Sequence, residues 1–228
     1  MVTVAQSRPS ERATFIQKTY IHLAGAVGSF VLVSILLFQL GIAEALTNFV
    51  MASRFSWFAI LGAFSLLGWF SRSLTAKADS VETQYAGLGI YVLAQALIFA
   101  PLLYIAAYFS DPTVLPTAAI LTLLLFGGLT AVALTTKTDF TFLGGILKIG
   151  GFVALGLIVC SVIFGFTLGL LFSVVMVVFA SAAILYDTSK IMRHYSKEHY
   201  VAASLELFAS VALLFWYVLQ IVMSLSRR

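Results

Sequence analysis

Long apolar runs separated by short polar segments make up most of the chain. Stretches without Asp, Glu, Lys, Arg or His cover 23–43, 55–71, 83–110, 112–136, 149–186 and 207–226. The apolar residues within each run are continuous and do not alternate with polar ones, which argues against sheets and membrane barrels. About 20 apolar residues suffice for one helix across a bilayer, so these runs predict membrane-spanning helices.

The run 149–186 is about twice as long as one crossing needs, at about 1.5 Å per helical residue. Gly165 and Gly169 mark the expected turn inside it. The pattern therefore predicts seven helices, near 20–42, 55–73, 83–109, 114–136, 140–164, 167–191 and 201–225. We expect an all-α membrane protein with a polar N-terminal tail, 1–18, and a single seven-helix domain, 19–228.

The composition excludes other classes of protein. The chain has 228 residues, of which 61% are hydrophobic and 10% are charged, whereas about a quarter of a soluble domain is charged. With 4 Pro and 20 Phe, disorder and collagen are excluded. The single Cys160 cannot form an internal disulfide. The net charge of +4 lies on no basic stripe, so no nucleic-acid partner is expected.

The basic residues predict an orientation, because Lys and Arg concentrate on the cytoplasmic side of membrane proteins. A cytoplasmic N-terminus puts nine of them inside: Arg8, Arg12, Lys18, Arg72, Lys77, Lys137, Lys190, Arg193 and Lys197. It puts three outside: Arg54, Arg227 and Arg228. The first helix follows a long polar tail and has no small-residue cleavage motif, so it is not a cleavable signal. We expect a cytoplasmic N-terminus and an external C-terminus. If two of the hydrophobic stretches do not span the membrane separately, the C-terminus lies in the cytoplasm instead.

Ionisable groups at hydrocarbon depth are the informative positions in such a chain, because they are costly there. Asp187 closes the sixth predicted helix. It is either a helix-end carboxylate, solvated or paired with Lys190 and Arg193, or a carboxylate that faces the bundle interior and responds to acid. Glu206 shares a helix face with Ser210, and it either faces protein or reaches the interface.

Other ionisable positions have simpler interpretations. Arg72 ends the second predicted helix and either anchors that helix or pairs with Asp187 or Glu206. Lys148 can extend toward the interface from the fifth helix, and His22 opens the first helix at the interface. Asp139 is a candidate N-cap for the helix that starts at Phe140.

The chain lacks the common motifs of enzymes and nucleotide-binding proteins. It contains no Gly-x-Ser-x-Gly, P-loop or His-Glu-x-x-His sequence. The hypothesis of an intramembrane hydrolase is therefore disfavoured, and no enzymatic activity or cofactor is expected. Glycine pairs such as Gly144-Gly145 and Gly150-Gly151 predict close approach between helices in lipid.

Three segments together resemble a known family. They are 129–147, with a Lys-x-Asp turn between two apolar runs, 183–191, with a Tyr-Asp-Thr sequence, and 99–103, with the sequence Phe-Ala-Pro-Leu-Leu. Taken in their order along the chain, they are similar to the Bax inhibitor-1 family (transmembrane Bax-inhibitor-motif proteins), and more narrowly to its bacterial inner-membrane branch. The resemblance covers 14–225.

The resemblance implies a bundle in which six helices surround a central seventh. It also implies a pH-sensitive calcium leak in several members, gated by two hydrogen-bonded aspartates near the cytoplasmic mouth. The first aspartate corresponds to Asp187, but the second position holds Ser210 here. A basic residue that pairs with this site in some members corresponds to Arg72. For bacterial members with this serine, the implied role is to bind or modulate a membrane-bound AAA protease.

From the residues we add a second acid. Glu206 lies one helical turn, about 6 Å, from Ser210, and it would then titrate with Asp187 as a coupled pair. This hypothesis requires that the two carboxylates lie close together and that Glu206 does not face lipid.

The residues and the resemblance together predict a pH-sensitive leak channel or permease-like membrane protein for cations, with Ca²⁺ as the favoured ion and acidic residues at the cytoplasmic side as its gate. Asp187 is the expected gate, Arg72 its counter-ion, Ser210 a neutral hydrogen-bond partner and Glu206 the substitute acid, with transient Ca²⁺ contact at the two carboxylates. The alternative is a non-conducting regulator that binds a membrane-bound AAA protease through the N-terminal tail, 2–17.

Overall fold

The computed structural model describes residues 4–53, 55, 56, 58, 62, 66, 80–136 and 138–226. Within these residues every regular element is a helix. The elements are η1 (Val4–Gln6), α1 (Pro9–Gln39), α2 (Ile42–Ala52), α4 (Val81–Tyr108), α5 (Val114–Thr135), η2 (Phe140–Phe142), α6 (Leu143–Phe164), α7 (Gly169–His194) and α8 (Tyr200–Ser226). The all-α prediction is confirmed for this part of the chain.

Six helices of the described part are long and apolar enough to cross a membrane: α1, α4, α5, α6 with η2, α7 and α8. The last five match the predicted spans 83–109, 114–136, 140–164, 167–191 and 201–225 to within a few residues. The predicted span 55–73 lies outside the described residues, apart from isolated positions, and Arg72 also lies outside them.

The predicted start of the first helix, at residue 20, was wrong. α1 begins at Pro9 and ends at Gln39, so much of the polar segment that was expected to form a tail is helical. Proline suits the first turn of a helix, because the N–H groups there have no partner within the helix. The polar side chains that follow Pro9 extend the helix beyond its apolar part.

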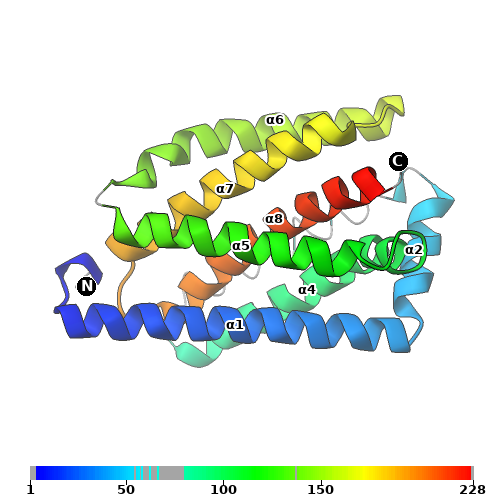
Figure 1. Cartoon of the computed structure of the whole chain (residues 1–228). Helices are drawn as coiled ribbons and strands as arrows, with labels where there is room; N and C mark the ends of the chain where they lie inside the picture. Colours follow the sequence, from blue (N-terminus) through cyan, green and yellow to red (C-terminus); the bar gives the residue numbers. More distant parts are fainter. Residues whose placement is uncertain are drawn as a thin grey trace.

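The short helix α2 was not predicted. It follows Gly41, whose φ of 72° is in the left-handed region that favours glycine. With 11 residues, or about 16 Å, α2 is too short to cross a bilayer core of about 30 Å. It packs on α4, and Figure 1 shows it across the end of the bundle that lies far from the N-terminus.

Helix α8 lies among the other long helices and packs against α1, α4, α5 and α7 (Figure 1). Half of the 18-residue apolar stretch of α8 is buried, whereas only 6% of the corresponding stretch of α6 is buried. Leu214 and Leu219 of α8 are fully buried in the main hydrophobic core. Ala96 of α4 and Ile184 of α7 are fully buried in the same core.

Many large apolar side chains point outward. Leu124 of α5, Phe152 of α6 and Leu171 of α7 are 67%, 77% and 77% exposed. A water-soluble protein rarely exposes so much contiguous apolar surface. In a membrane these side chains contact lipid, which agrees with the span assignments.

Glycines shape the contact between α6 and α7. Gly165 ends α6 with a φ of 74°, and Gly169 begins α7 with a φ of 68°, so the predicted turn is confirmed. A Cβ atom on Gly144 would lie 2.7 Å from Cε2 of Tyr186, and one on Gly150 would lie 2.9 Å from Cε2 of Phe179. The absence of side chains at Gly144 and Gly150 therefore lets two aromatic rings of α7 lie against α6.

The N-terminal segment folds back onto the bundle. Val4 of η1 is fully buried, and its backbone N–H donates to the carbonyl oxygen of Tyr195 at 2.8 Å. Lys197 reaches Glu11 of α1 at 3.2 Å. We call the end of the molecule that holds η1, the start of α1 and the α7–α8 connection the N-terminal end (Figure 1).

Candidate functional site

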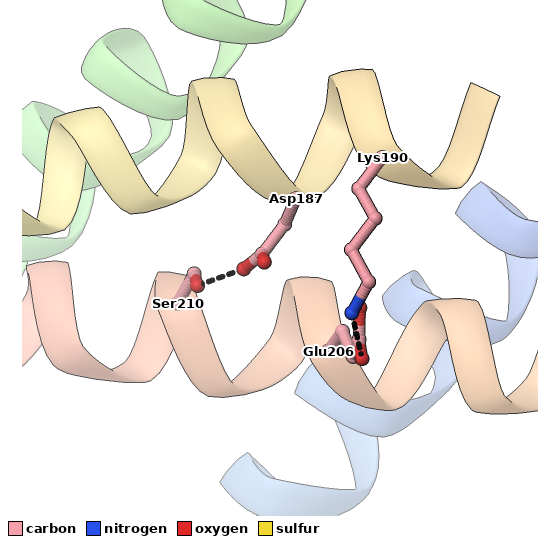
Figure 2. Close-up of polar contacts among 4 residues, drawn as sticks. All are labelled: Asp187, Lys190, Glu206 and Ser210. Carbon is pink, nitrogen blue, oxygen red and sulfur yellow. Dashed lines mark hydrogen bonds and ion pairs between the residues drawn. The ribbon is translucent and has the colours of Figure 1, made fainter. Parts of the chain in front are cut away.

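The candidate site lies between α7 and α8, toward the N-terminal end. Asp187 and Lys190 project from α7 toward α8, and Glu206 and Ser210 project from α8 toward α7 (Figure 2). Residues three or four apart share a helix face, so each helix presents two polar groups to the other. The arrangement has two neighbouring contacts, which α7 and α8 build together.

Asp187 and Ser210 form the first contact. The hydroxyl Oγ of Ser210 donates a hydrogen bond to Oδ2 of Asp187. Ser210 is buried, and Asp187 is half-buried. Hydrogen bonds to a charged acceptor are stronger than bonds between neutral groups, so the serine provides a neutral partner for this carboxylate. The structure thus brings together two residues that were predicted for the site.

Lys190 and Glu206 form the second contact. The Nζ atom of Lys190 lies 2.9 Å from Oε1 and 3.2 Å from Oε2 of Glu206. The two side chains are 33% and 25% exposed. Nζ also lies 5.9 Å from the ring centroid of Tyr186 and 5.8 Å from that of Tyr195. The ammonium group is therefore held by a carboxylate and by two aromatic faces.

Sequence reasoning did not assign Lys190 to Glu206. It considered Lys190 only as a partner for Asp187 at the helix end. The sequence did contain a hint that Lys190 points toward the neighbouring helix. Lys190 follows Asp187 by three residues, so it shares the helix face of Asp187. Glu206 does face protein, as the hypothesis of a second acid required, but its carboxylate binds this lysine.

The acidic groups of the site share one basic partner. Lys190 is near enough to Asp187 for an electrostatic interaction as well, so one ammonium group serves two carboxylates. Ca²⁺ takes 6 to 8 oxygen ligands, and within the described residues no group of three or more His, Cys, Asp or Glu is placed to hold a metal ion. Contact with a cation at Asp187 and Glu206 would first require Lys190 to move.

Asp139 connects the α5–α6 turn to the last turns of α7. Its Oδ1 accepts hydrogen bonds from the backbone N–H of Thr141 at 3.0 Å and from Ser189 Oγ at 3.1 Å. Nε of Arg193 lies 3.4 Å from the same oxygen. The predicted N-cap is confirmed. The hydrogen bonds from Thr141 contribute most to lowering the pKa of Asp139 below its ordinary value of 3.8. The hydrogen bond from Ser189 and the charge of Arg193 lower it further.

The remaining ionisable candidates lie elsewhere. Nδ1 of His22 lies 2.7 Å from the carbonyl oxygen of Lys18, and Nε2 shares a hydrogen bond of 2.5 Å with the Tyr85 hydroxyl. The His22 ring lies 5.0 Å from the ring of Tyr200, so it links α1 to α4 and α8. Lys148 is exposed on α6. The expected role of Arg72 falls outside the described residues.

Most of the chain matches one family model. That model carries the description "Inhibitor of apoptosis-promoting Bax1" and matches residues 12–227. The matched range includes all six described membrane-spanning helices for almost their whole length, and all four residues in Figure 2.

Individual relatives are bacterial. An uncharacterized protein of Pseudomonas aeruginosa is 41% identical over 110 residues, which cover 48% of this chain and 49% of that protein. The chain thus matches about half the length of this relative. The Escherichia coli protein named "Modulator of FtsH protease YccA" is 29% identical over 201 residues, which cover 87% of this chain and 88% of the relative. A second E. coli sequence with the same match is named "Inner membrane protein YccA".

Proposed function

The chain belongs to the family of inhibitors of apoptosis-promoting Bax1, and we propose that it is a non-conducting membrane regulator that binds and modulates a membrane-bound AAA protease. It is an integral membrane protein of the bacterial inner-membrane type. The similarity to the modulator of FtsH protease, over 87% of the chain, is the observation that carries the proposal.

The N-terminal end offers the surface for this contact. The segment 2–17 combines polar and charged residues with η1 and the first turns of α1. Ser10 and Glu11 lie on this part of α1, and Glu11 binds Lys197 of the α7–α8 connection. A partner that binds here would contact the N-terminal segment and this connection together.

We further propose seven membrane spans, with 55–73 as the second, an N-terminus in the cytoplasm and a C-terminus outside. The distribution of Lys and Arg supports this orientation. The two termini lie at opposite ends of the bundle (Figure 1), as an odd number of crossings requires. In this topology α8 is the central helix and the N-terminal end faces a cytoplasmic partner.

Site-specific photo-crosslinking tests the regulator proposal. A photoreactive residue at Ser10, which is exposed on α1, should crosslink to a membrane-bound AAA protease of the FtsH type. The matched control is the same residue at Leu32, which is 65% exposed among apolar neighbours of the same helix. Crosslinks from Ser10 and none from Leu32 support the proposal. Absence of the protease from both samples contradicts it.

A pH-sensitive leak for cations, with Ca²⁺ as the favoured ion, is the second candidate function. The pair of half-buried carboxylates, Asp187 and Glu206, on facing membrane-spanning helices favours it, since such groups are retained at hydrocarbon depth mainly for function. In this proposal Asp187 is the gate, Ser210 its hydrogen-bond partner, Glu206 the second acid and Arg72 a counter-ion.

Flux measurements separate the two candidates. The protein is reconstituted in liposomes, and Ca²⁺ flux is recorded against pH for the wild type and for Asp187→Asn. A flux that depends on pH and changes in Asp187→Asn supports the leak. No flux at any pH, with the protease recovered from Ser10, supports the regulator and contradicts the leak.

A further inference from the structure

A large cavity lies between α4, α6, α7 and α8, next to the Asp187–Ser210 contact. Its volume is about 980 Å³, at the upper end of the range for ligand pockets, which is about 300 to 1,000 Å³. Apolar side chains form most of its wall, among them Phe99 of α4, Leu155 of α6, Phe172 of α7 and Trp216 of α8. The cavity is thus an apolar cleft between membrane-spanning helices that is partly open to their surroundings, since Leu155 in its wall is 51% exposed.

The cavity is long and runs parallel to the helices. Its lining on α8 extends from Ala209 to Gln220, or about 16 Å at 1.5 Å per residue. On α7 it extends from Leu168, just before the helix, to Ala183, or about 22 Å. A bilayer core is about 30 Å thick, so the cavity runs along more than half of the hydrocarbon region.

Polar groups lie toward the two ends of this apolar space. At one end Ser210 borders the cavity while it donates to Asp187. Near the other end Oε1 of Gln220 accepts a hydrogen bond from Ser173 at 3.1 Å, and no hydrogen bond in the described part of the chain uses its Nε2. Gln220 therefore offers this amide N–H as a donor to a ligand.

We propose that this cavity binds one acyl chain of a membrane lipid, with the ester carbonyl of the lipid at Gln220 and the chain running past Trp216 toward Ser210. Its walls belong to membrane-spanning helices, so acyl chains are the surrounding solvent. Its elongated shape along the helices suits a chain rather than a compact ligand. The proposal is independent of the proposed function.

Quenching of Trp216 fluorescence tests the inference. Trp57→Phe and Trp69→Phe leave Trp216 as the single tryptophan of the full chain. The protein is reconstituted in phosphatidylcholine vesicles whose acyl chains carry bromine at mid-chain. A bound chain should quench Trp216. Ala154→Phe on α6 and, separately, Leu213→Phe on α8 place a ring in the cavity and should each remove most of the quenching.

Val153→Phe is the matched control, because Val153 is 56% exposed and does not line the cavity. It should leave the quenching unchanged. Absence of quenching in the parent protein overturns the inference, as does equal quenching in the parent and both filled variants, since Trp216 would then meet bulk lipid.

Mass spectrometry of the intact protein, released from detergent, adds a second readout. The wild type should retain one lipid per chain, and Ala154→Phe should retain none. A compact ligand other than a lipid in the wild type would overturn the assignment of the occupant.

Discussion

Lys190 of α7 binds Glu206 of α8 at 2.9 Å, one helical turn from the hydrogen bond that joins Asp187 to Ser210. Both contacts join the same two helices, and both involve a half-buried carboxylate. The two acids therefore have different partners, one a cation and the other a neutral hydroxyl. Substitutions at Asp187 and at Glu206 should therefore affect stability differently.

Loss of Lys190 should cost more stability than loss of the charge on Glu206. Lys190→Met leaves a carboxylate that is 25% exposed without its cation, at a cost of about 1 to 2 kcal/mol, between the values for exposed and buried pairs. Glu206→Gln leaves the lysine near Asp187 and against Tyr195 and should cost less. The double variant should regain part of the loss. Denaturant unfolding in micelles measures these differences.

The control for this cycle is Lys197→Met. Its ion pair with Glu11 has side chains that are 44% and 43% exposed, so its loss should cost less than about 1 kcal/mol. Equal destabilisation by Lys190→Met and Lys197→Met would contradict the importance assigned to the α7–α8 pair.

Gly144→Val should destabilise the contact between α6 and α7. A Cβ atom there would lie 2.7 Å from the Tyr186 ring, and overpacking of this kind costs roughly 1 to 3 kcal/mol. At Gly145 nothing lies within 4 Å of an added Cβ atom, so Gly145→Val is the matched control with the same change in helix propensity. Thermal unfolding in micelles should give a lower Tm for Gly144→Val. Equal Tm values would refute the close approach.

Asp139 should make stability dependent on pH in the acid range. Its pKa is lowered in the folded protein, so its contribution is fully present above the unfolded pKa and is lost as the pH falls through the folded pKa. Asp139→Asn keeps a capping oxygen but loses the attraction to Arg193. The wild type should be more stable than Asp139→Asn at pH 5. The difference should shrink as the pH falls below the ordinary pKa of 3.8 and vanish only below the lowered pKa of the folded protein. Thermal unfolding at each pH tests this, and a constant difference would contradict it.

Val4→Asp should release the N-terminal segment. Burial of a valine side chain contributes roughly 1.5 kcal/mol or more, and an aspartate in the same place would be costly. Hydrogen exchange of the Val4 amide, which donates to Tyr195, should accelerate by about tenfold or more. Ser10→Asp, at an exposed position, should leave this exchange unchanged. Unchanged exchange in Val4→Asp would show that the segment is not held by this contact.

Much of the fold could be predicted because the lipid environment imposes it. Continuous apolar runs predicted α4 to α8 to within a few residues, and glycine spacing predicted the turn between α6 and α7. Helix α2 escaped prediction because it directly follows α1, and the break depends on Gly41, which adopts a positive φ. The docking of Val4 was also not predictable, since a tertiary contact across the whole chain decides it.

The candidate site could be predicted only in part. The placement of Asp187 opposite Ser210 followed from the family resemblance. The partner of Glu206 depends on the register of α7 against α8, which the spacing along one helix does not define. Lys190 has a long, flexible side chain and reaches Glu206 across the two helices, whereas residue order had suggested only Asp187 as its partner.

The most direct test of the proposed regulator is the rate at which a membrane-bound AAA protease of the FtsH type degrades a membrane substrate in vesicles that also contain this protein. We predict a rate that changes with the amount of the protein, saturates, and returns to the basal value when residues 1–8 are deleted. A rate that stays unchanged at every amount of the folded, full-length protein would contradict the account.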